Sequence, residues 1–395
     1  MTEQLRGSNE LAPPASLRED SRILVVKLAD IGDMLLATPA LRLLRESYPK
    51  AHLAALVQPS SAEVLRGSTL VDELILFDQH RYDSVIASLS PAALWSAARE
   101  LLGLRQKRFD CLLLFHHMVT DWGVAKYAAL CLASGAPRRV GLDDGRAWFL
   151  TNRVPDQGFG ARHEAEYMLA LVRAVGAEGP PGGLELPIGA TDREFASQVL
   201  RSSVHPRVAI HPGSGTYSLA RRWPASRFAE VADRLALEEG VDIVLVGGPT
   251  EVALAAEVKE HMRAPALDLS GRTTLRQLAA VLEQCDLLVG NDSGVVHVAV
   301  AAGTPVVAIF GPTNHRAWAP YQPSMTPREN RVLHRIVRIN VPCSPCLYRG
   351  HRLGRRQGCP NRDCLRLLMP SAVVAEAQEA LRYLWRHGGK SKRAT

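Results

Sequence analysis

An aspartate that follows a glycine turn, near the start of the chain, is a residue type that can perform acid–base chemistry. The run LADIGD (28–33) follows the apolar segment ILVVKL, and Gly32 lets the backbone turn before Asp33. A carboxylate at the end of a parallel strand can accept a proton from a hydroxyl group. Asp33 is therefore the candidate general base, with Asp30 as a competitor. Spacing alone gives more weight to the alternative that Asp33 only caps a helix.

A small-residue loop in the second half has the composition of a phosphate site. The run HPGSGTYSLARRWP (211–224) places glycine and serine ahead of a basic pair. Backbone N–H groups in such turns can hold phosphate oxygens, and an arginine can pair with them in a fork. The run is neither a Walker A loop nor a G-x-G-x-x-G loop, and composition leaves a binding role and a structural role equally open. The candidates are Ser214, Gly215, Thr216, Arg221 and Arg222.

The run GNDSGVVHVAVAAG (290–303) is the sharpest feature of the sequence. It predicts a strand that turns into a helix at Asp292, with the N–H groups of Ser293 and Gly294 pointing outward. A helix N-terminus of this kind favours an anion such as pyrophosphate. His297 lies one helical turn further on and could reach the same ligand. The alternative is a capped helix with a packed histidine.

A third strand end carries an acidic residue. The segment VGGPTE (246–251) ends in Glu251, which is positioned for the hydroxyl groups of a ribose. The carboxyl ends of parallel strands meet at one edge of a sheet, so the three candidate segments are expected to converge there. The sequence therefore predicts a nucleotide site in the second half.

Four cysteines cluster near the C-terminus, in the runs PCSPC (342–346) and GCPNRDC (358–364). Closely spaced pairs of thiolates are typical of tetrahedral zinc sites. Reduced structural cysteines are an equally weighted alternative, and disulfides are disfavoured in a reducing cytosol. No base accompanies the cluster, so we assign it no catalytic role. The candidate ligands are Cys343, Cys346, Cys359 and Cys364.

The elements that position these residues repeat one rhythm in both halves. Short apolar segments alternate with amphipathic helical patterns, which is typical of parallel α/β domains. We expect a helix over 35–48, a helix over 226–239 with Ser226 as its N-cap, and a last strand over 305–311. Strand–turn–helix units in this order imply right-handed crossovers and doubly wound sheets.

A boundary between two such domains is expected in the Gly- and Pro-rich stretch AVGAEGPPGGLELP, because this composition favours turns and linkers. The expected division has five segments. They are a disordered tail over 1–20, a first Rossmann-like domain over 21–178, a linker region over 179–205, a second Rossmann-like domain over 206–369, and a C-terminal helix with a basic tail over 370–395.

The charge of the chain is mildly basic, with 47 basic against 40 acidic residues and a net charge of +7. Such a surface either suits an acidic partner or is simply solvated. Aromatic residues make up only 6%, and no segment has the pattern of a basic recognition helix, so nucleic acid is not an expected partner. No apolar run reaches the ~18 residues that span a bilayer. The N-terminal segment also lacks the apolar core of a signal peptide, and we expect a cytoplasmic location.

Several ordered motifs together resemble the ADP-heptose–lipopolysaccharide heptosyltransferase family, glycosyltransferase family 9. They are VVKLADIGDMLLATPALRLLRESYP, HPGSG with RRWP, VLVGGPTE and GNDSGVVHVAVAAGTPVVAIFGPT, in this order over roughly residues 23–320. The resemblance implies a GT-B fold, in which two Rossmann-like domains face each other across a cleft. The second domain would bind the sugar nucleotide and the first domain the acceptor.

The resemblance also implies roles for particular residues. Asp33 matches the family's catalytic base, which reverses the preference for a capping role. Arg221 stands where the family has a lysine, and a planar guanidinium is not equivalent to an ammonium group, so the departure leaves the identity of the donor open. Glu251 matches a ribose-binding acid, and the remaining matches, to a nucleotide-phosphate motif, are Asp292, Ser293, Gly294 and His297.

The function expected from this resemblance is inverting transfer of a heptose from ADP-heptose, without a required cofactor. The acceptor would be a phosphorylated, lipid-linked saccharide of the lipopolysaccharide inner core, met by the basic patches at the inner face of the membrane. One alternative is the same fold acting on another nucleotide sugar, as a transferase or an epimerase. The other is a nucleotide- or glycan-binding protein without turnover.

Overall fold

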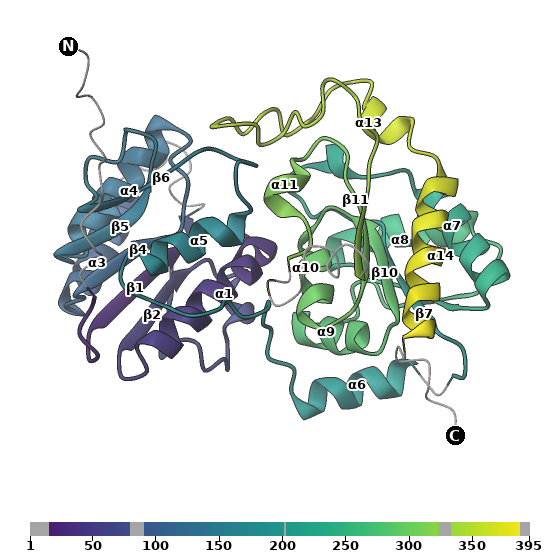
Figure 1. Ribbon diagram of the computed structural model, residues 1–395, viewed down its shortest axis with the longest axis horizontal. Helices are drawn as coiled ribbons and strands as arrows, with labels where there is room; N and C mark the ends of the chain where they lie inside the picture. The colour runs from purple at the N-terminus through teal and green to yellow at the C-terminus, as the bar shows by residue number, and fades with distance from the viewer. Residues whose placement is uncertain (1–15, 80–90, 201–202, 322, 324–332, 388–395) are drawn as a thin grey trace, which may run out of the picture.

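Two parallel β-sheets form the framework of the chain, one in each half. The computed structural model describes residues 16–79, 91–200, 203–321, 323 and 333–387. The two sheets lie side by side, each with helices on its faces (Figure 1). The strands of the first sheet are β1 (Arg22–Lys27), β2 (His52–Val57), β3 (Glu73–Leu76), β4 (Cys111–Leu114), β5 (Arg138–Asp143) and β6 (Asn152–Pro155). Those of the second are β7 (Arg207–His211), β8 (Asp242–Leu245), β9 (Ala266–Asp268), β10 (Leu287–Asn291), β11 (Val306–Ile309) and β12 (His334–Val337).

Both sheets have the same strand order. The first runs β3-β2-β1-β4-β5-β6 and the second, read from its other edge, runs β9-β8-β7-β10-β11-β12. All pairings between these strands are parallel, and the order reverses next to the first strand of each sheet. Ligands of doubly wound sheets bind beyond the carboxyl ends of the strands at this reversal. The predicted α/β class with two Rossmann-like sheets is therefore confirmed.

Helices connect the strands and cover the sheets. In the first half they are α1 (Ile31–Ser47), α3 (Pro91–Gln106), α4 (Asp121–Ala133) and α5 (Glu164–Arg173). In the second half they are α6 (Ala190–Leu200), α7 (Ala225–Glu239), α8 (Val252–His261), α9 (Leu275–Glu283), α10 (Gly294–Ala301), α11 (His315–Trp318), α13 (Asp363–Arg366) and α14 (Pro370–Arg386). In the described part of the chain, no helix is both long enough and apolar enough to cross a membrane.

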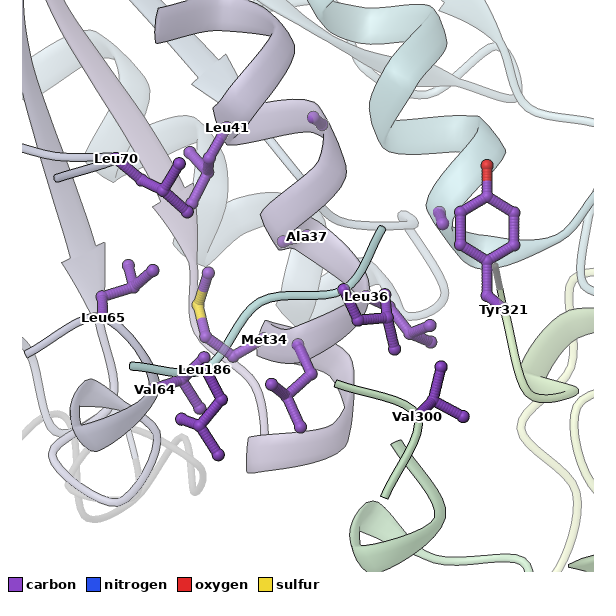
Figure 2. Packing of buried hydrophobic residues seen from close by; sticks show 14 of the residues in the cluster. Met34, Leu36, Ala37, Leu41, Val64, Leu65, Leu70, Leu186, Val300 and Tyr321 are labelled. Carbon is purple, nitrogen blue, oxygen red and sulfur yellow. The ribbon is translucent and has the colours of Figure 1, made fainter. Parts of the chain in front are cut away.

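Helices α1 and α10 bring the two halves into contact. Leu36 on α1 belongs to the same buried apolar cluster as Val300 on α10, and Figure 2 shows both side chains at the junction of the halves. A Cβ atom added at Gly32 would lie 3.0 Å from the Cα of Gly294. The first turns of the two helices therefore touch, and a side chain at either glycine would have to displace its neighbour by a few tenths of an ångström.

A second connection between the halves is made by an arm, residues 347–353. Its two sides are paired by hydrogen bonds between Arg349 and Arg352, and it reaches from the second half toward the first (Figure 1, olive). At its tip, the N–H of Phe159 donates to the carbonyl of Gly350 at 2.8 Å. The amide of Asn314 donates to the carbonyls of Phe159 and Tyr348 on either side, at 3.1 and 3.0 Å. The arm thus bridges the two sheets.

Three expectations about these elements are wrong in detail. The first helix begins at Ile31 rather than 35, because the glycine turn already belongs to its first turn. Helix α7 has Pro224 at its N-cap and begins before Ser226, since a proline whose N–H is not needed suits a helix start. The strand β11 is followed by β12, which completes the sheet.

The predicted domain limits stay a prediction. Residues 1–15 of the expected disordered tail lie outside the described residues. Helix α6, in the expected linker region, packs against α9, and the C-terminal helix α14 packs against α7. Both segments therefore contact the second half rather than stand apart from it.

Candidate active site

Asp33 lies beyond the carboxyl end of β1, in the first turn of α1, and is partly exposed. Its Oδ1 atom accepts a hydrogen bond from the indole Nε1–H of Trp318 at 3.1 Å. Trp318 is the last residue of α11 in the second half. The N-cap position of α1 belongs to Asp30, so the alternative that Asp33 is the cap is wrong. The carboxylate instead faces the opposite half of the molecule.

The N-terminus of α10 lies directly across from Asp33. Helix α10 begins at Gly294 with Ser293 in the N-cap position, as the sequence predicts. His297, one turn on, is buried, and the Cβ built at Gly32 would come 3.2 Å from its Cδ2 atom. Burial, followed by the charge of His163, lowers the pKa of His297 to about 3. This histidine is therefore neutral at physiological pH.

A buried hydrogen-bond chain supports this helix start. The hydroxyl of Ser293 lies 3.1 Å from Nδ1 of His211, whose Nε2 lies 3.0 Å from Oε2 of Glu251. Glu251 also accepts from the backbone N–H groups of Gly215 and Gly248, each at 3.0 Å. Burial acts to raise the pKa of Glu251, but the hydrogen bond and charge of His211 and the two N–H groups lower it to about 2. The ionised carboxylate thus joins the ends of β7, β8 and β10.

The basic pair lies at the same edge. Arg221 donates from Nη2 to the carbonyl of Ser214 at 2.6 Å, and its Nη1 lies 3.6 Å from Oδ2 of Asp292. Arg222 comes within 3.9 Å of Glu251. Burial raises the pKa of Asp292, although the charge of Arg221 opposes the rise. Two cations and two carboxylates therefore alternate around the ends of these strands.

Several buried polar atoms at this edge have no hydrogen-bond partner among the described residues. They are Nε of Arg221, Nε of Arg222, Oδ2 of Asp292 and Nδ1 of His297. Buried polar groups are paired in most native structures, so such a concentration calls for a ligand or water. The set contains both donors and carboxylate acceptors, which suits a ligand that carries anionic and hydroxyl groups.

The small-residue loop makes hydrogen bonds within the protein. The hydroxyl of Ser214 is buried and donates to the carbonyl of Ser218 at 3.0 Å. The N–H of Gly215 is held by Glu251, and the φ of Gly215 is +66°, which glycine adopts without strain. Both groups are thus engaged within the protein, whereas Thr216 is exposed. Their roles in phosphate binding stay a prediction.

Sequence reasoning missed a row of aromatic rings beside Asp33. The ring of Trp318 packs at 4.4 Å from that of Tyr348, which lies 5.9 Å from the ring of Tyr217. Phe159 from the first half packs against both Trp318 and Tyr348. These residues come from four separate loops or short elements, and no spacing in the sequence links them. His211 was also missed, although it begins the HPG run.

A buried charged cluster stands behind Phe159 and was not expected either. Nδ1 of His117 lies 2.8 Å from Asp156, and its Nε2 lies 3.3 Å from Glu164. Burial acts to lower the pKa of His117, but the charge of Glu164 and the hydrogen bond to Asp156 raise it to about 9. Asp156 also accepts from His351 of the segment that forms the arm, at 3.2 Å through its carbonyl. The cluster fixes the loop that meets the arm.

The four C-terminal cysteines lie near one another but are not arranged as ligands. Cys364 is buried, Cys346 is half-buried, and Cys343 and Cys359 are exposed. Burial, followed by the neighbouring thiols, raises the pKa of Cys364 to about 11. In the described ranges, no three His, Cys, Asp or Glu side chains are grouped so as to hold a metal ion.

Known proteins similar to this chain are glycosyltransferases. Residues 99–354 match the model of glycosyltransferase family 9 (heptosyltransferase). Over 308 residues, 74% of this chain and 83% of the relative, the chain is 28% identical to lipopolysaccharide heptosyltransferase 2 of Escherichia coli (strain K12). The fold is similar to that of the glycosyl transferase family 9 protein from Veillonella parvula, with a TM-score of 0.70 at 24% identity over 93% of this chain and 99% of that one. It is also similar to E. coli ADP-heptose lps heptosyltransferase II, with a TM-score of 0.67 at 22% identity over 92% and 99% of the two chains.

Proposed function

The chain belongs to glycosyltransferase family 9, and we propose that it transfers a heptose from ADP-heptose to a lipopolysaccharide inner-core acceptor with inversion at the anomeric carbon. The observation that carries this proposal is the position of Asp33, opposite the N-terminus of α10 and held by Trp318. The first half supplies the carboxylate of Asp33 as a base. The second half supplies backbone N–H groups that can hydrogen-bond a leaving phosphate. The names of its relatives, which include lipopolysaccharide heptosyltransferase 2 of E. coli, agree with this substrate class.

In the proposed reaction, an acceptor hydroxyl attacks the anomeric carbon of the donor sugar. The new bond joins the acceptor oxygen to this carbon, and the bond from the carbon to the β-phosphate oxygen of the donor breaks. Asp33 takes the hydroxyl proton, since a positioned carboxylate on the far side of the sugar can act as a general base. ADP leaves with the bonding electron pair, and its developing charge is stabilised by the start of α10 and by Arg221.

We place the nucleotide sugar at the edge of the second sheet where buried polar atoms lack hydrogen-bond partners among the described residues. The diphosphate would contact Arg221, Arg222 and the N–H groups at Ser293 and Gly294. Glu251, whose carboxylate already holds two loops, would present its remaining lone pairs to the ribose. The further residues of the proposed nucleotide-sugar site are Ser214, Gly215, Thr216, Asp292 and His297.

The cysteine cluster has the donor set of a zinc site, four thiols in two closely spaced pairs on one segment, although the described structure does not gather three of them around one point. We propose a structural zinc site formed by Cys343, Cys346, Cys359 and Cys364, in which the thiols would ionise on binding the metal. Metal analysis of the purified chain tests the proposal, and a preparation without zinc contradicts it.

The place of action that fits an acceptor anchored in lipid is the cytoplasmic face of the inner membrane. The chain would act there as a peripheral protein, with its basic surface toward anionic groups. Nucleic acid is not a proposed partner.

The test of the proposed function is turnover with a panel of nucleotide sugars and a phosphorylated inner-core oligosaccharide as acceptor. ADP-heptose should give the highest kcat/KM, with release of ADP and a product anomer opposite to that of the donor, measured by NMR. A preference for a UDP- or GDP-sugar would contradict ADP-heptose as the donor and would assign the chain another nucleotide sugar. Binding of ADP without transfer of a sugar to any acceptor would contradict the proposal that the chain is an enzyme.

A further inference from the structure

A cavity of about 580 Å³ opens beside the loop that carries the basic pair. It is lined by residues 216, 217, 219 and 220 of this loop and by residues 356–360 and 362, which follow the arm. The volume falls within the range of small-ligand sites, about 300–1,000 Å³. Of the residues proposed for the nucleotide-sugar site, Thr216 lines this cavity, so the cavity adjoins that site without sharing its other residues.

The charged groups on the cavity wall are all cationic. Arg356 and Arg362 line it, and no carboxylate does. Arg356 is fixed in place, because its Nε donates to the carbonyl of Tyr217 at 2.9 Å and its guanidinium lies 4.5 Å from the centre of the Tyr217 ring. Arg362 is exposed and has no acidic partner in the described part of the chain. Two guanidinium groups without a counter-charge favour a phosphate, which they can bind through paired N–H donors.

The cavity is connected to the reaction centre by the row of aromatic rings. Tyr217 forms part of its wall and packs on Tyr348, and Tyr348 packs on Trp318, which binds Asp33. All three rings are partly exposed. Aromatic side chains are common linings of ligand sites because they present flat apolar surface, and sugar rings have apolar faces that match it. The row therefore leads from the proposed base to the cationic cavity.

We propose that this cavity binds a phosphate substituent of the acceptor saccharide, while the sugar rings of the acceptor lie along Trp318, Tyr348 and Tyr217. The inference rests on the proposed function, because it assigns the acceptor of that reaction, and it adds contacts from the second half to the acceptor site that the resemblance implies in the first half. It commits to the acceptor rather than to a lipid headgroup, since the aromatic row begins at the carboxylate that the acceptor hydroxyl must reach. The arm, which contributes Tyr348 and bridges the two halves, holds the row in place.

The test compares a phosphorylated inner-core oligosaccharide with the same oligosaccharide after phosphatase treatment. For Arg362→Ala, the KM for the phosphorylated acceptor should rise about tenfold, the effect of losing one charged hydrogen bond. The kcat and the affinity for ADP should not change, and Arg362→Lys should restore part of the loss. With the dephosphorylated acceptor, the wild type and Arg362→Ala should have the same KM.

Arg352→Ala is the matched control, because Arg352 is an exposed arginine of the arm that does not line the cavity. Its KM should stay near that of the wild type with both acceptors. Arg356→Ala is a second variant, and it should also raise the KM for the phosphorylated acceptor. Unchanged ADP affinity and thermal unfolding would show that the Tyr217 loop, which Arg356 contacts, keeps its structure. An increase in KM that persists with the dephosphorylated acceptor, or equal losses for Arg352 and Arg362, would overturn the assignment.

Two further measurements separate this proposal from the proposed function. Calorimetric binding of the phosphorylated oligosaccharide to the ADP-bound protein does not require turnover, and Arg362→Ala should weaken it about tenfold. Thus a chain that transfers no sugar but shows this loss retains the cavity assignment. Co-sedimentation with phosphatidylglycerol vesicles tests the lipid source. Loss of vesicle binding in Arg362→Ala, with an unchanged acceptor KM, would assign the cavity to the membrane and overturn the proposal.

Discussion

Trp318 and Asp33 are joined by a hydrogen bond that crosses from one half of the molecule to the other, with 3.1 Å between the indole Nε1 and Oδ1. The tryptophan is in turn packed by Phe159 of the first half and Tyr348 of the arm. The orientation of the proposed base therefore depends on residues of both halves. A carboxylate that is correctly aimed only when the halves are together would limit reaction in their separated state.

Replacement of the proposed base tests its chemistry. Asp33→Asn keeps the shape of the side chain and removes its ability to take a proton, so kcat should fall by about a hundredfold or more. The affinity for ADP, measured by calorimetry, should stay near that of the wild type because the nucleotide is expected on the opposite wall. Transfer near the wild-type rate would assign the base elsewhere, with Asp30 as the next candidate.

Replacement of the tryptophan tests positioning. Trp318→Phe keeps an aromatic ring in the row but removes the N–H donor, and kcat should fall about tenfold, the effect of losing a hydrogen bond to a charged group. The KM for the donor should change little. Trp148→Phe is the control, since this tryptophan is 65% exposed and its ring packs on Phe149 rather than on the aromatic row. A fall in kcat of equal size in both variants would contradict a positioning role.

Addition of a methyl group at the junction of the two helices tests how closely the halves must approach. In Gly32→Ala the new Cβ would lie 3.0 Å from the backbone of Gly294, which cannot move without displacing α10. Relief of this contact requires a shift of a few tenths of an ångström between the two helix starts, so transfer should fall about tenfold. Gly103→Ala is the control, because a Cβ there meets nothing within 4 Å. That variant should be fully active and more stable by about 1 kcal/mol.

Removal of the first arginine of the basic pair tests the donor wall. Arg221→Ala should weaken ADP binding about tenfold, since it removes a charge-assisted contact to phosphate. Arg221→Lys should recover part of this affinity because it keeps the charge but not the planar fork. Calorimetric titration with ADP measures both effects. An unchanged affinity in Arg221→Ala would leave the arginine with only its contacts to Ser214 and Asp292.

The buried cluster around His117 predicts a loss of stability in alkali. The pKa of His117 is raised from 6.5 to about 9 in the folded chain, so its contribution is fully present below about pH 6.5 and is lost as pH rises through about 9. His117→Gln should remove this dependence. Urea unfolding between pH 6 and 10 tests it, and a wild type that loses no more stability than the variant over this range would contradict the raised pKa.

Much of the fold could be predicted from the alternation of apolar strands and amphipathic helices. Both sheets and their winding follow from this pattern, as does the start of α10 at Gly294, where a polar run meets a long apolar one. Element ends were less predictable. Pro224 caps α7 although Ser226 has the better capping side chain, because the chain already turns into the helix at the proline.

The candidate site was predictable only where its residues lie at strand ends. Asp33, Glu251 and Asp292 could be named because each lies in the short turn or helix start that follows an apolar strand. The aromatic row could not, since its rings come from loops whose paths depend on tertiary contacts such as those of Asn314. The hydrogen bonds that Ser214 and Gly215 make within the protein could not be predicted either. They depend on the path of the loop and on Glu251, and the local sequence shows neither.

The touching first turns of α1 and α10 place two helix starts with partial positive charge against one another. Asp33, in the first turn of α1, offsets part of this charge, and the remainder weakens the attraction between the halves that the surrounding apolar contacts provide. A nucleotide diphosphate at this junction would cancel the repulsion, and its departure as a product would restore it. The bound donor would then hold the two halves together through its negative charge. Release of ADP would favour separation of the halves before the next reaction cycle.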